Sequence, residues 1–211
     1  MQITIFGATG MVGKHLVKMA LTDGHTVIAF GRNVTALLDA DKTNDQLKAI
    51  KGYVFDEHDV YEAIKGSDAV ISVLGGAFDG SDQTRSLGIK NIIKQMEAAG
   101  VKRIVALGGM GVLNANEEGL IMDLPSYPAE YIPVGKEHLK AYNLLKESDL
   151  EWTFVCSPDI KDEANTGNYT TNKDYPPTPN HYKIAAGDLA EFMLAEAVKN
   201  EYVNSRVGIS N

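Results

Sequence analysis

The sequence predicts an α/β protein built on a doubly wound parallel sheet, and three observations lead to that prediction. Short apolar runs such as residues 69–74 and 103–107 alternate along the chain with helical patterns. These runs are almost entirely apolar, which is typical of strands covered by helices on both faces. A glycine-rich turn joins the first run, residues 3–6, directly to the first helical pattern. Together these features favour a single-domain Rossmann-type fold.

The order of the elements follows from the same alternation. Strands are expected at residues 2–6, 26–30, 53–55, 69–74, 103–107 and 152–156, with a weaker one near 205–209. Helices are expected at residues 11–22, 34–40, 58–65, 83–99, 135–148 and 187–198. Because crossovers between parallel strands are right-handed, the predicted strand order is 3-2-1-4-5-6, with the weaker run as a seventh strand at the edge. Residues 1–211 are expected to form one NAD(P)-binding domain.

Composition and charge exclude several classes of function. The chain has 211 residues, a net charge of −8 and no basic run longer than the Lys102–Arg103 pair. Nucleic-acid binding requires clustered Lys and Arg, so we expect no nucleic-acid partner. No apolar run approaches the length of a membrane span, and no membrane partner is expected. The first residues lack the basic region and cleavage site of a secretory signal, which favours a cytoplasmic location.

Metal and thiol chemistry are not expected either. Cys156 is the only cysteine, which excludes an internal disulfide and a cysteine zinc cluster. Its apolar neighbours indicate a buried core thiol rather than a nucleophile. The histidines without metal-ligand spacing, interpreted as structural, are His15, His25, His58 and His181.

The glycine-rich turn is the strongest functional signal. Gly7, Gly10 and Gly13 follow the first strand at three-residue spacing. We expect Gly7 to allow a sharp turn, Gly10 to let a pyrophosphate approach the backbone, and Gly13 to let the first helix pack closely on the sheet. The unpaired amides at the start of that helix then face the phosphates. The alternative is a structural tight turn. The other residues of the turn expected to bind the cofactor are Thr9, Met11 and Val12.

The end of the second strand favours NADP(H) over NAD(H). NAD-binding folds typically place an acidic residue there, about 20 positions past the glycines, where it binds the ribose hydroxyls. In this chain Gly31 is followed by Arg32 and Asn33, with no carboxylate. A guanidinium binds a 2′-phosphate through charge-assisted hydrogen bonds, so Arg32, with Asn33 beside it, is the predicted 2′-phosphate site. The alternative is a solvent-exposed turn arginine.

Further cofactor contacts are expected where the other strands end, because ligands in this architecture bind at the carboxyl ends of the strands. Asp56 is interpreted either as a partner of the adenine amino group or as a cap of the helix that starts near Asp59. The remaining expected contacts are Leu74, Gly75, Gly76, Gly108, Ser157 and Pro158.

Two long segments, residues 108–134 and 157–186, follow the fifth and sixth strands. Long loops in a compact domain are usually either functional or disordered. Because both follow the carboxyl ends of strands, we favour substrate-side segments that cover the reactive end of the cofactor.

The general acid of a conventional short-chain reductase is not where it is needed. Such enzymes place a Tyr and a Lys four residues apart on the helix after strand five, where the Tyr protonates the developing alkoxide. The three matches to Tyr-x-x-x-Lys are Tyr61/Lys65, Tyr142/Lys146 and Tyr169/Lys173. The first and third lie outside that helix, and the second lies about two turns too far along it. All three are interpreted as solvated surface pairs, with a functional Tyr/Lys pair as the alternative for Tyr142/Lys146. Acceptors that take a hydride and a solvent proton, such as flavins or quinones, are therefore favoured.

Several segments spread along the chain match one known family. They are Gly7-Ala-Thr-Gly10, Gly66-Ser-Asp-Ala-Val70, Glu147-Ser-Asp-Leu150, Pro158-Asp-Ile160, Thr166-Gly-Asn-Tyr169 and Asp188-Leu-Ala-Glu-Phe-Met-Leu194. On these segments the chain resembles the atypical short-chain dehydrogenase/reductases, and most of all the biliverdin reductase B and flavin reductase group.

The resemblance implies NADPH-dependent reduction of a flavin, quinone or other small conjugated acceptor. It also implies that Arg32 binds the 2′-phosphate and that His138 lies near the cofactor, although a half-exposed histidine on a helix face is the alternative for His138. The family has a serine where Gly109 stands and a histidine where Asp159 stands, both beside the substrate. His138, Gly109 and Asp159 are therefore the candidate catalytic positions, and the substrate pocket differs from that of the family.

Two other functions are compatible with this fold. A non-catalytic NADP(H) sensor of the NmrA type also lacks the Tyr/Lys pair and is the alternative to an enzyme. A sugar-nucleotide epimerase is disfavoured by the short C-terminal region and the missing pair. We expect a monomer or a small homo-oligomer whose only other partner is the small-molecule acceptor.

Overall fold

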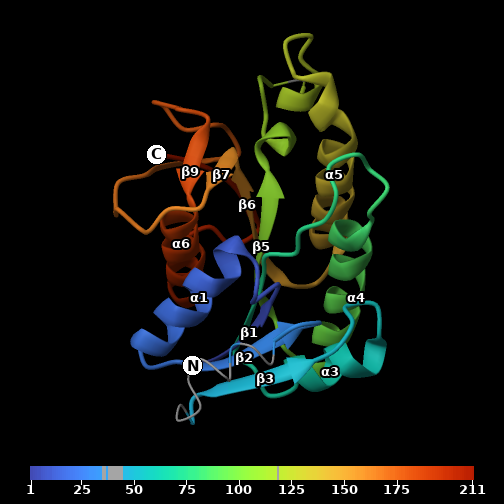
Figure 1. Ribbon diagram of the computed structural model, residues 1–211. Helices are drawn as coiled ribbons and strands as arrows, with labels where there is room; N and C mark the ends of the chain where they lie inside the picture. The colour runs from blue at the N-terminus through green and yellow to red at the C-terminus, as the bar shows by residue number, and fades with distance from the viewer. Residues whose placement is uncertain (35–36, 38–44, 118) are drawn as a thin grey trace.

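The structure, a computed structural model, describes residues 1–34, 37, 45–117 and 119–211. Its centre is a sheet in the order β3-β2-β1-β4-β5-β6-β10-β8 (Figure 1). All neighbouring strands are parallel except β10 and β8, which are antiparallel. The predicted order of the first six strands is therefore confirmed. The strands are β1 (Gln2–Phe6), β2 (Thr26–Gly31), β3 (Leu47–Lys51), β4 (Ala69–Ser72), β5 (Arg103–Gly109), β6 (Glu151–Ser157), β8 (Thr170–Lys173) and β10 (Ser205–Ser210).

Helices cover both faces of the sheet, as a doubly wound fold requires. Figure 1 shows α1 (Met11–Thr22) and α6 (Ala186–Lys199) on one side. On the other side lie α3 (Glu57–Ile64), α4 (Thr84–Ala99) and α5 (Ile132–Glu147). No helix in the described part of the chain is both long and apolar enough to cross a membrane.

The two helical layers explain why the strands are mostly apolar. In β1, Ile3 and Ile5 pack in the core beneath α1 and α6, whereas Phe6 packs in the core on the side of α3, α4 and α5. In β5, Val105 joins the first core and Ile104 the second. Successive side chains of a strand point to opposite faces, and here both faces are buried, so neither face admits a polar pattern.

The third strand was predicted in the wrong place. It was expected at residues 53–55 but lies at Leu47–Lys51, on the edge of the sheet, where one side is open to solvent and lysines are tolerated. Tyr53 and Phe55 are apolar but 63% and 57% exposed, in the turn that leads to α3. Most of the helix expected at 34–40 falls outside the described residues.

The C-terminal end of the sheet also differs from the prediction. The run near 205–209 forms β10, but it is not the edge strand because β8 pairs with its outer side. The predicted Tyr169/Lys173 loop therefore contains a strand. The segment 157–186 further holds β7 (Asp159–Lys161) and β9 (Lys183–Ala185), which pair in parallel. The segment 108–134 holds three short 3-10 helices, η1 (Met110–Val112), η2 (Ile121–Asp123) and η3 (Ala129–Tyr131).

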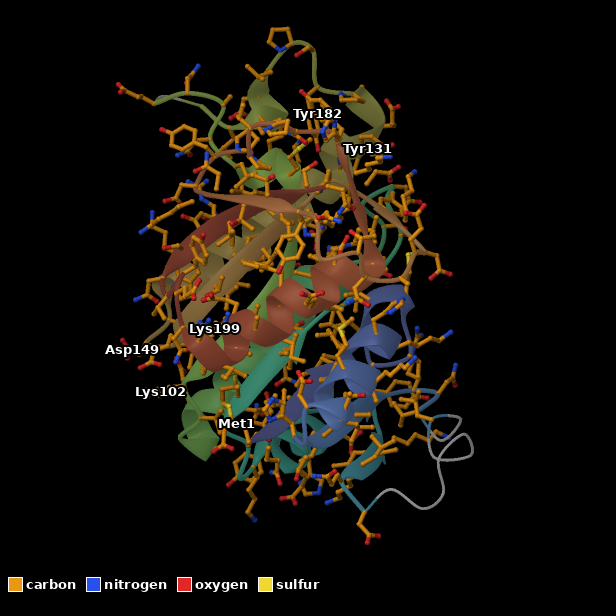
Figure 2. All side chains as sticks on the ribbon, turned by 90° about the vertical axis from the view of Figure 1, so that its left-hand side faces the viewer. Met1, Lys102, Tyr131, Asp149, Tyr182 and Lys199 are labelled. Carbon is orange, nitrogen blue, oxygen red and sulfur yellow. The ribbon has the colours of Figure 1, made fainter. Side chains whose placement is uncertain are left out.

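Both segments lie at the end of the molecule where β5 terminates (Figure 1). Figure 2 places Tyr131 and Tyr182 at this end, and Met1 and Lys102 at the opposite one. The two tyrosines are 45% and 65% exposed. Both segments thus lie at the carboxyl end of β5, and their role on the substrate side stays a prediction.

Candidate functional site

The glycine-rich turn connects β1 to α1 and leaves the start of the helix open. Gly7 has a φ of +83°, and a Cβ added to it would lie 2.6 Å from the carbonyl oxygen of Val73, so the position requires glycine. Gly10 is the N-cap of α1, its amide donates to Gly7 O at 2.9 Å, and no side chain caps the helix. The first turn of α1 contains no acidic residue. Its free amides and positive dipole end are thus available to an anion.

The remaining residues of the turn divide between solvent and core. Gly10 and Met11 are exposed, and a Cβ added to Gly10 would meet only Gly7 O, at 3.2 Å. Thr9 is half-buried, and Val12 is buried in the core beneath α1. A Cβ added to Gly13 would overlap Gly7 O, so the close packing predicted against the sheet is made against the turn itself.

The end of β2 brings Arg32 and Asn33 to the same edge of the sheet as the glycine-rich turn, because β1 and β2 are neighbours in register. Both side chains are exposed. Within the described part of the chain, the Arg32 guanidinium has no hydrogen-bond or ion-pair partner. Asp56 is the N-cap of α3 and its Oδ1 accepts from the Asp59 amide at 2.9 Å, which is the capping alternative of the prediction.

The backbone after β4 carries the predicted contacts Leu74, Gly75 and Gly76. Gly75 is exposed, and a Cβ added to it would meet no atom within 4 Å. Gly76 is different, because its added Cβ would lie 2.6 Å from Oδ2 of Asp82. Arg85 donates from Nη2 to Gly76 O at 2.9 Å. Asp82 and Arg85 belong to no glycine pattern, so their place beside Gly76 could not be predicted from the sequence.

The ends of β5 and β6 are tied together. A Cβ added to Gly108 would overlap the ring of Phe154, so this glycine is required for packing inside the sheet. Ser157 is buried and its hydroxyl donates to Gly108 O at 3.3 Å, which leaves mainly backbone atoms to face a ligand. Pro158 follows and is half-buried. Cys156 is fully buried, and burial raises the pKa of its thiol, as expected for a core residue.

His138 on α5 is partly buried, which agrees with the half-exposed alternative of the prediction, and it lies against Gly109 at the end of β5. A Cβ added to Gly109 would be 2.9 Å from Cδ2 of the imidazole. Burial, reinforced by the positive charge of Arg85, lowers the pKa of His138 to about 3, and the opposing effect of Glu137 is smaller. The ring is therefore neutral at physiological pH. Its Nδ1 is buried and has no hydrogen-bond partner, and such atoms usually have one in a protein or its complex.

A neighbouring carboxylate fixes this part of α5. Glu137 is buried and accepts a hydrogen bond from the Ser86 hydroxyl of α4 at 2.5 Å. It also forms an ion pair with Lys140 at 2.7 Å. The helix that carries His138 is thus attached to α4 immediately beside the histidine.

Asp159, the third candidate catalytic position, faces solvent. It lies on β7, its side chain is 66% exposed, and it pairs with Lys161 at 2.6 Å. The structure therefore places an exposed ion pair on β7 at the position where the family has a histidine.

The interpretation of Tyr142 as a solvated residue is wrong. Its ring packs on Trp152 and Phe154 of β6, with centroid distances of 5.7 and 5.9 Å. The Arg206 guanidinium lies over the same ring at 5.0 Å. Tyr169 likewise packs against the ring of Phe192, at 6.1 Å. These aromatic rings are part of the structure of the sheet and its helices.

Two of the segments that match the family, Thr166–Tyr169 and Asp188–Leu194, form one structural cluster. Asp188, in the first turn of α6, is fully buried. It accepts hydrogen bonds from the amides of Thr166 and Gly167 at 2.6 and 2.8 Å, from the Thr166 hydroxyl at 2.9 Å and from Asn211 at 2.7 Å. Burial by itself raises the pKa of Asp188, but these hydrogen bonds bring it below its usual value.

The structure also contains a groove that lies away from the strand ends. A groove of about 600 Å³ lies between α1 and α6 and is lined by residues such as Met19, Leu194 and Val198. None of the predicted site residues lines it. Among the residues that the structure describes, no group of three or more His, Cys, Asp or Glu is arranged to hold a metal ion.

Comparison with known proteins shows the family to which this chain belongs. Residues 7–200 match the family model described as NAD(P)H-binding, and the chain belongs to that Rossmann-type, oxidoreductase-like family. A relative from Bacillus subtilis (strain 168), the uncharacterized protein YwnB, is 32% identical over 183 residues, which are 82% of this chain and 80% of the relative. The predicted resemblance to atypical short-chain reductases is confirmed.

Two solved structures are similar over the whole chain. One, from Streptococcus pneumoniae TIGR4, is named as a candidate NADH-flavin reductase; it is 26% identical with a TM-score of 0.83, covering 100% of this chain and 99% of that one. The other, from Burkholderia pseudomallei, is named as a candidate exported protein; it is 27% identical with a TM-score of 0.85, with the same coverage.

Proposed function

We propose that this protein is an NADPH-dependent reductase of a flavin, quinone or similar small conjugated acceptor. The observation that carries the proposal is the neutral His138 beside Gly109, together with the packing of Tyr142 into the aromatic cluster of β6. Neither side chain is suited to give a proton to an alkoxide. A reaction that needs orientation more than acid catalysis fits these residues.

The residues at the strand ends fit a dinucleotide. The amides at the start of α1 would hold the pyrophosphate, and the exposed Gly10 and Gly75 leave space for it and for the adjoining ribose. Arg32 would bind the 2′-phosphate. When bound, the cofactor supplies a hydride. His138 would orient its reactive end through Nε2, which lies on the edge of the ring that faces Gly109.

The acceptor would lie at the same end of the molecule. Tyr131 and Tyr182 are exposed there and offer flat aromatic surfaces, which suit a planar conjugated molecule. Their hydroxyls and the Asp159–Lys161 pair would face its polar edge. We propose a monomer or small homo-oligomer in the cytoplasm, without a nucleic-acid or membrane partner. Cell fractionation and size-exclusion chromatography test these two points.

The choice of cofactor is tested with Arg32→Ala. Loss of a charge-assisted contact is worth about 1.5–3 kcal/mol, or roughly tenfold to more than a hundredfold in affinity. NADPH should bind more weakly to the variant by that factor, whereas NADH should bind as before. Lys51→Ala, at the exposed end of β3, is the control for loss of a surface cation near this edge. Equal losses of NADPH and NADH affinity in Arg32→Ala would contradict the assignment.

The choice of reaction is tested by NADPH oxidation with flavins, quinones and simple aldehydes. Flavins or quinones should be reduced faster than aldehydes, because an aldehyde leaves an alkoxide without a donor. Tight NADPH binding without oxidation by any acceptor would instead favour the NmrA-type sensor.

A further inference from the structure

The backbone that follows β4 is held in place by one buried side chain of α4. Arg85 is 7% exposed and donates from Nη2 to Gly76 O at 2.9 Å and from Nη1 to Ala77 O at 3.0 Å. Both carbonyls belong to the segment that leaves the sheet next to the glycine-rich turn. Val73, at its start, donates to Phe6 O at 2.9 Å, and its carbonyl lies against Gly7.

Asp82 holds the same segment from its other side. Its Oδ2 accepts from the Ala77 amide at 3.3 Å and its Oδ1 from the Thr84 amide at 2.8 Å. Hydrogen bonding from Thr84 keeps the pKa of Asp82 below its usual range, so the carboxylate is charged at neutral pH. Gly76 fits between the two charged groups, because an added Cβ would be 2.6 Å from Asp82 Oδ2 and 3.1 Å from Arg85 Nη1.

The clamp formed by Asp82 and Arg85 decides which way the neighbouring glycine faces. Gly76 is turned toward the two side chains, and Gly75 is turned to open space, where an added Cβ meets nothing within 4 Å. The exposed face at Gly75 is the one that the cofactor would contact. A shift of the segment by even about 1 Å would close that face or withdraw it from the ligand. Misplacements of this size reduce reaction rates on the order of a hundredfold.

Arg85 also acts on the other half of the site. Its positive charge is the second cause, after burial, that keeps His138 neutral. The charged groups that influence the imidazole are Arg85 from α4 and Glu137 from α5 itself. One guanidinium therefore touches the backbone beside the proposed pyrophosphate site, and its charge adds to the effect of burial on the pKa of His138.

We propose that Arg85 is a positioning residue that holds residues 75–77 in their cofactor-binding shape. The proposal rests on the proposed NADPH-dependent function. The competing interpretation is that Arg85 only anchors the start of α4, which would affect stability but not cofactor affinity.

The test compares Arg85→Met and Arg85→Lys with Lys90→Met, which removes an exposed cation from the same helix. NADPH affinity is measured by calorimetry, kcat and KM by NADPH oxidation, and the titration of His138 by NMR of labelled histidine. Arg85→Met should weaken NADPH binding about ten- to a hundredfold. It should also raise the titration midpoint of His138. Arg85→Lys should recover part of the affinity and keep the low midpoint, and Lys90→Met should match the wild type.

A second variant keeps the test decisive where Arg85→Met does not fold. Gly76→Ala removes no charge but forces the clamp apart, and NADPH binding should weaken by a similar factor, whereas His138 should titrate as in the wild type. Wild-type NADPH affinity in a folded Arg85→Met or Gly76→Ala protein would overturn the inference. If the wild-type protein itself does not bind NADPH, the proposed function fails first, and the inference about the loop fails with it.

Discussion

Gly10 and Gly13 are three residues apart in one turn, but the structure assigns them different tasks, which Gly10→Ala and Gly13→Ala should separate. At Gly10, φ is −73° and ψ is 176°, ordinary values for any residue, and the new Cβ would meet only Gly7 O at 3.2 Å. At Gly13 the new Cβ would overlap Gly7 O and lie 2.8 Å from the backbone of Ala8. The first substitution intrudes on the ligand side of the turn and the second on the protein itself.

The expected magnitudes differ accordingly. Gly10→Ala should change the free energy of unfolding by less than about 1 kcal/mol, the usual scale of an N-cap substitution. Gly13→Ala forces backbone to move and should cost about 1–3 kcal/mol. For a chain of this length, a loss of 1 kcal/mol in unfolding free energy lowers the Tm by about 2–4 °C, so the Tm of Gly13→Ala should fall by about 2–12 °C. In Gly10→Ala the new methyl group would crowd the bound pyrophosphate at a similar cost of about 1–3 kcal/mol. NADPH binding should therefore weaken about fivefold to more than a hundredfold.

Thermal denaturation and calorimetric titration of both variants measure these quantities on the same samples. The wild-type protein and Gly24→Ala serve as references, since Gly24 lies in the turn after α1 and has a φ of +79° with no neighbour within 4 Å. Gly24→Ala should therefore reduce stability through backbone strain without altering NADPH affinity. Wild-type affinity in Gly10→Ala would show that its open face is not the pyrophosphate site. Wild-type stability in Gly13→Ala would refute the packing argument.

Two further predictions concern the aromatic cluster and the family motifs. Tyr142→Phe keeps the ring on β6 and loses only the hydroxyl, so acceptor reduction should fall less than about threefold, compared with about 10²–10⁴ for loss of a general acid. A hundredfold loss of rate at unchanged NADPH affinity would restore a conventional Tyr/Lys mechanism. Asp188→Asn should lower the free energy of unfolding by about 1.5–3 kcal/mol at pH 7. The folded-state pKa of Asp188 is depressed, so its stabilisation is present above the unfolded pKa of about 4 and disappears as the pH falls through the folded value. Urea unfolding at pH 7 and at pH 3 should show a shrinking difference from wild type, with the exposed Glu62→Gln as control; a constant difference would contradict this origin.

The sequence by itself determined the layers of the fold and the location of the glycine-rich site. The mostly apolar runs that form β1, β4 and β5 indicate burial on both faces, and this signal is contained in each run alone. The strand order followed from the handedness of the crossovers. The turn at Gly7 could be predicted for a similar reason, since its φ of +83° is a local requirement that glycine meets.

Elements at the edges of the sheet were not determined in this way. In β3 the run Leu47–Lys51 contains two lysines because its outer side meets solvent, and the more apolar Tyr53 and Phe55 are exposed in a turn. Hydrophobicity predicts burial only on average, and an edge strand is only partly buried, so its sequence is less apolar. The pairing of β8 with β10 likewise depends on segments that are more than 30 residues apart.

The details of the site were decided by the tertiary structure. Arg85 reaches back to the carbonyl of Gly76, and the ring of Tyr142 is directed to β6 instead of the end of β5. His138 is neutral because of burial and a charge on another helix. Periodicity along a chain specifies which face of an element is buried, but not which side chain of another element will meet it. The partners, and with them the pKa values and the backbone shape of the site, exist only once the helices are packed on the sheet.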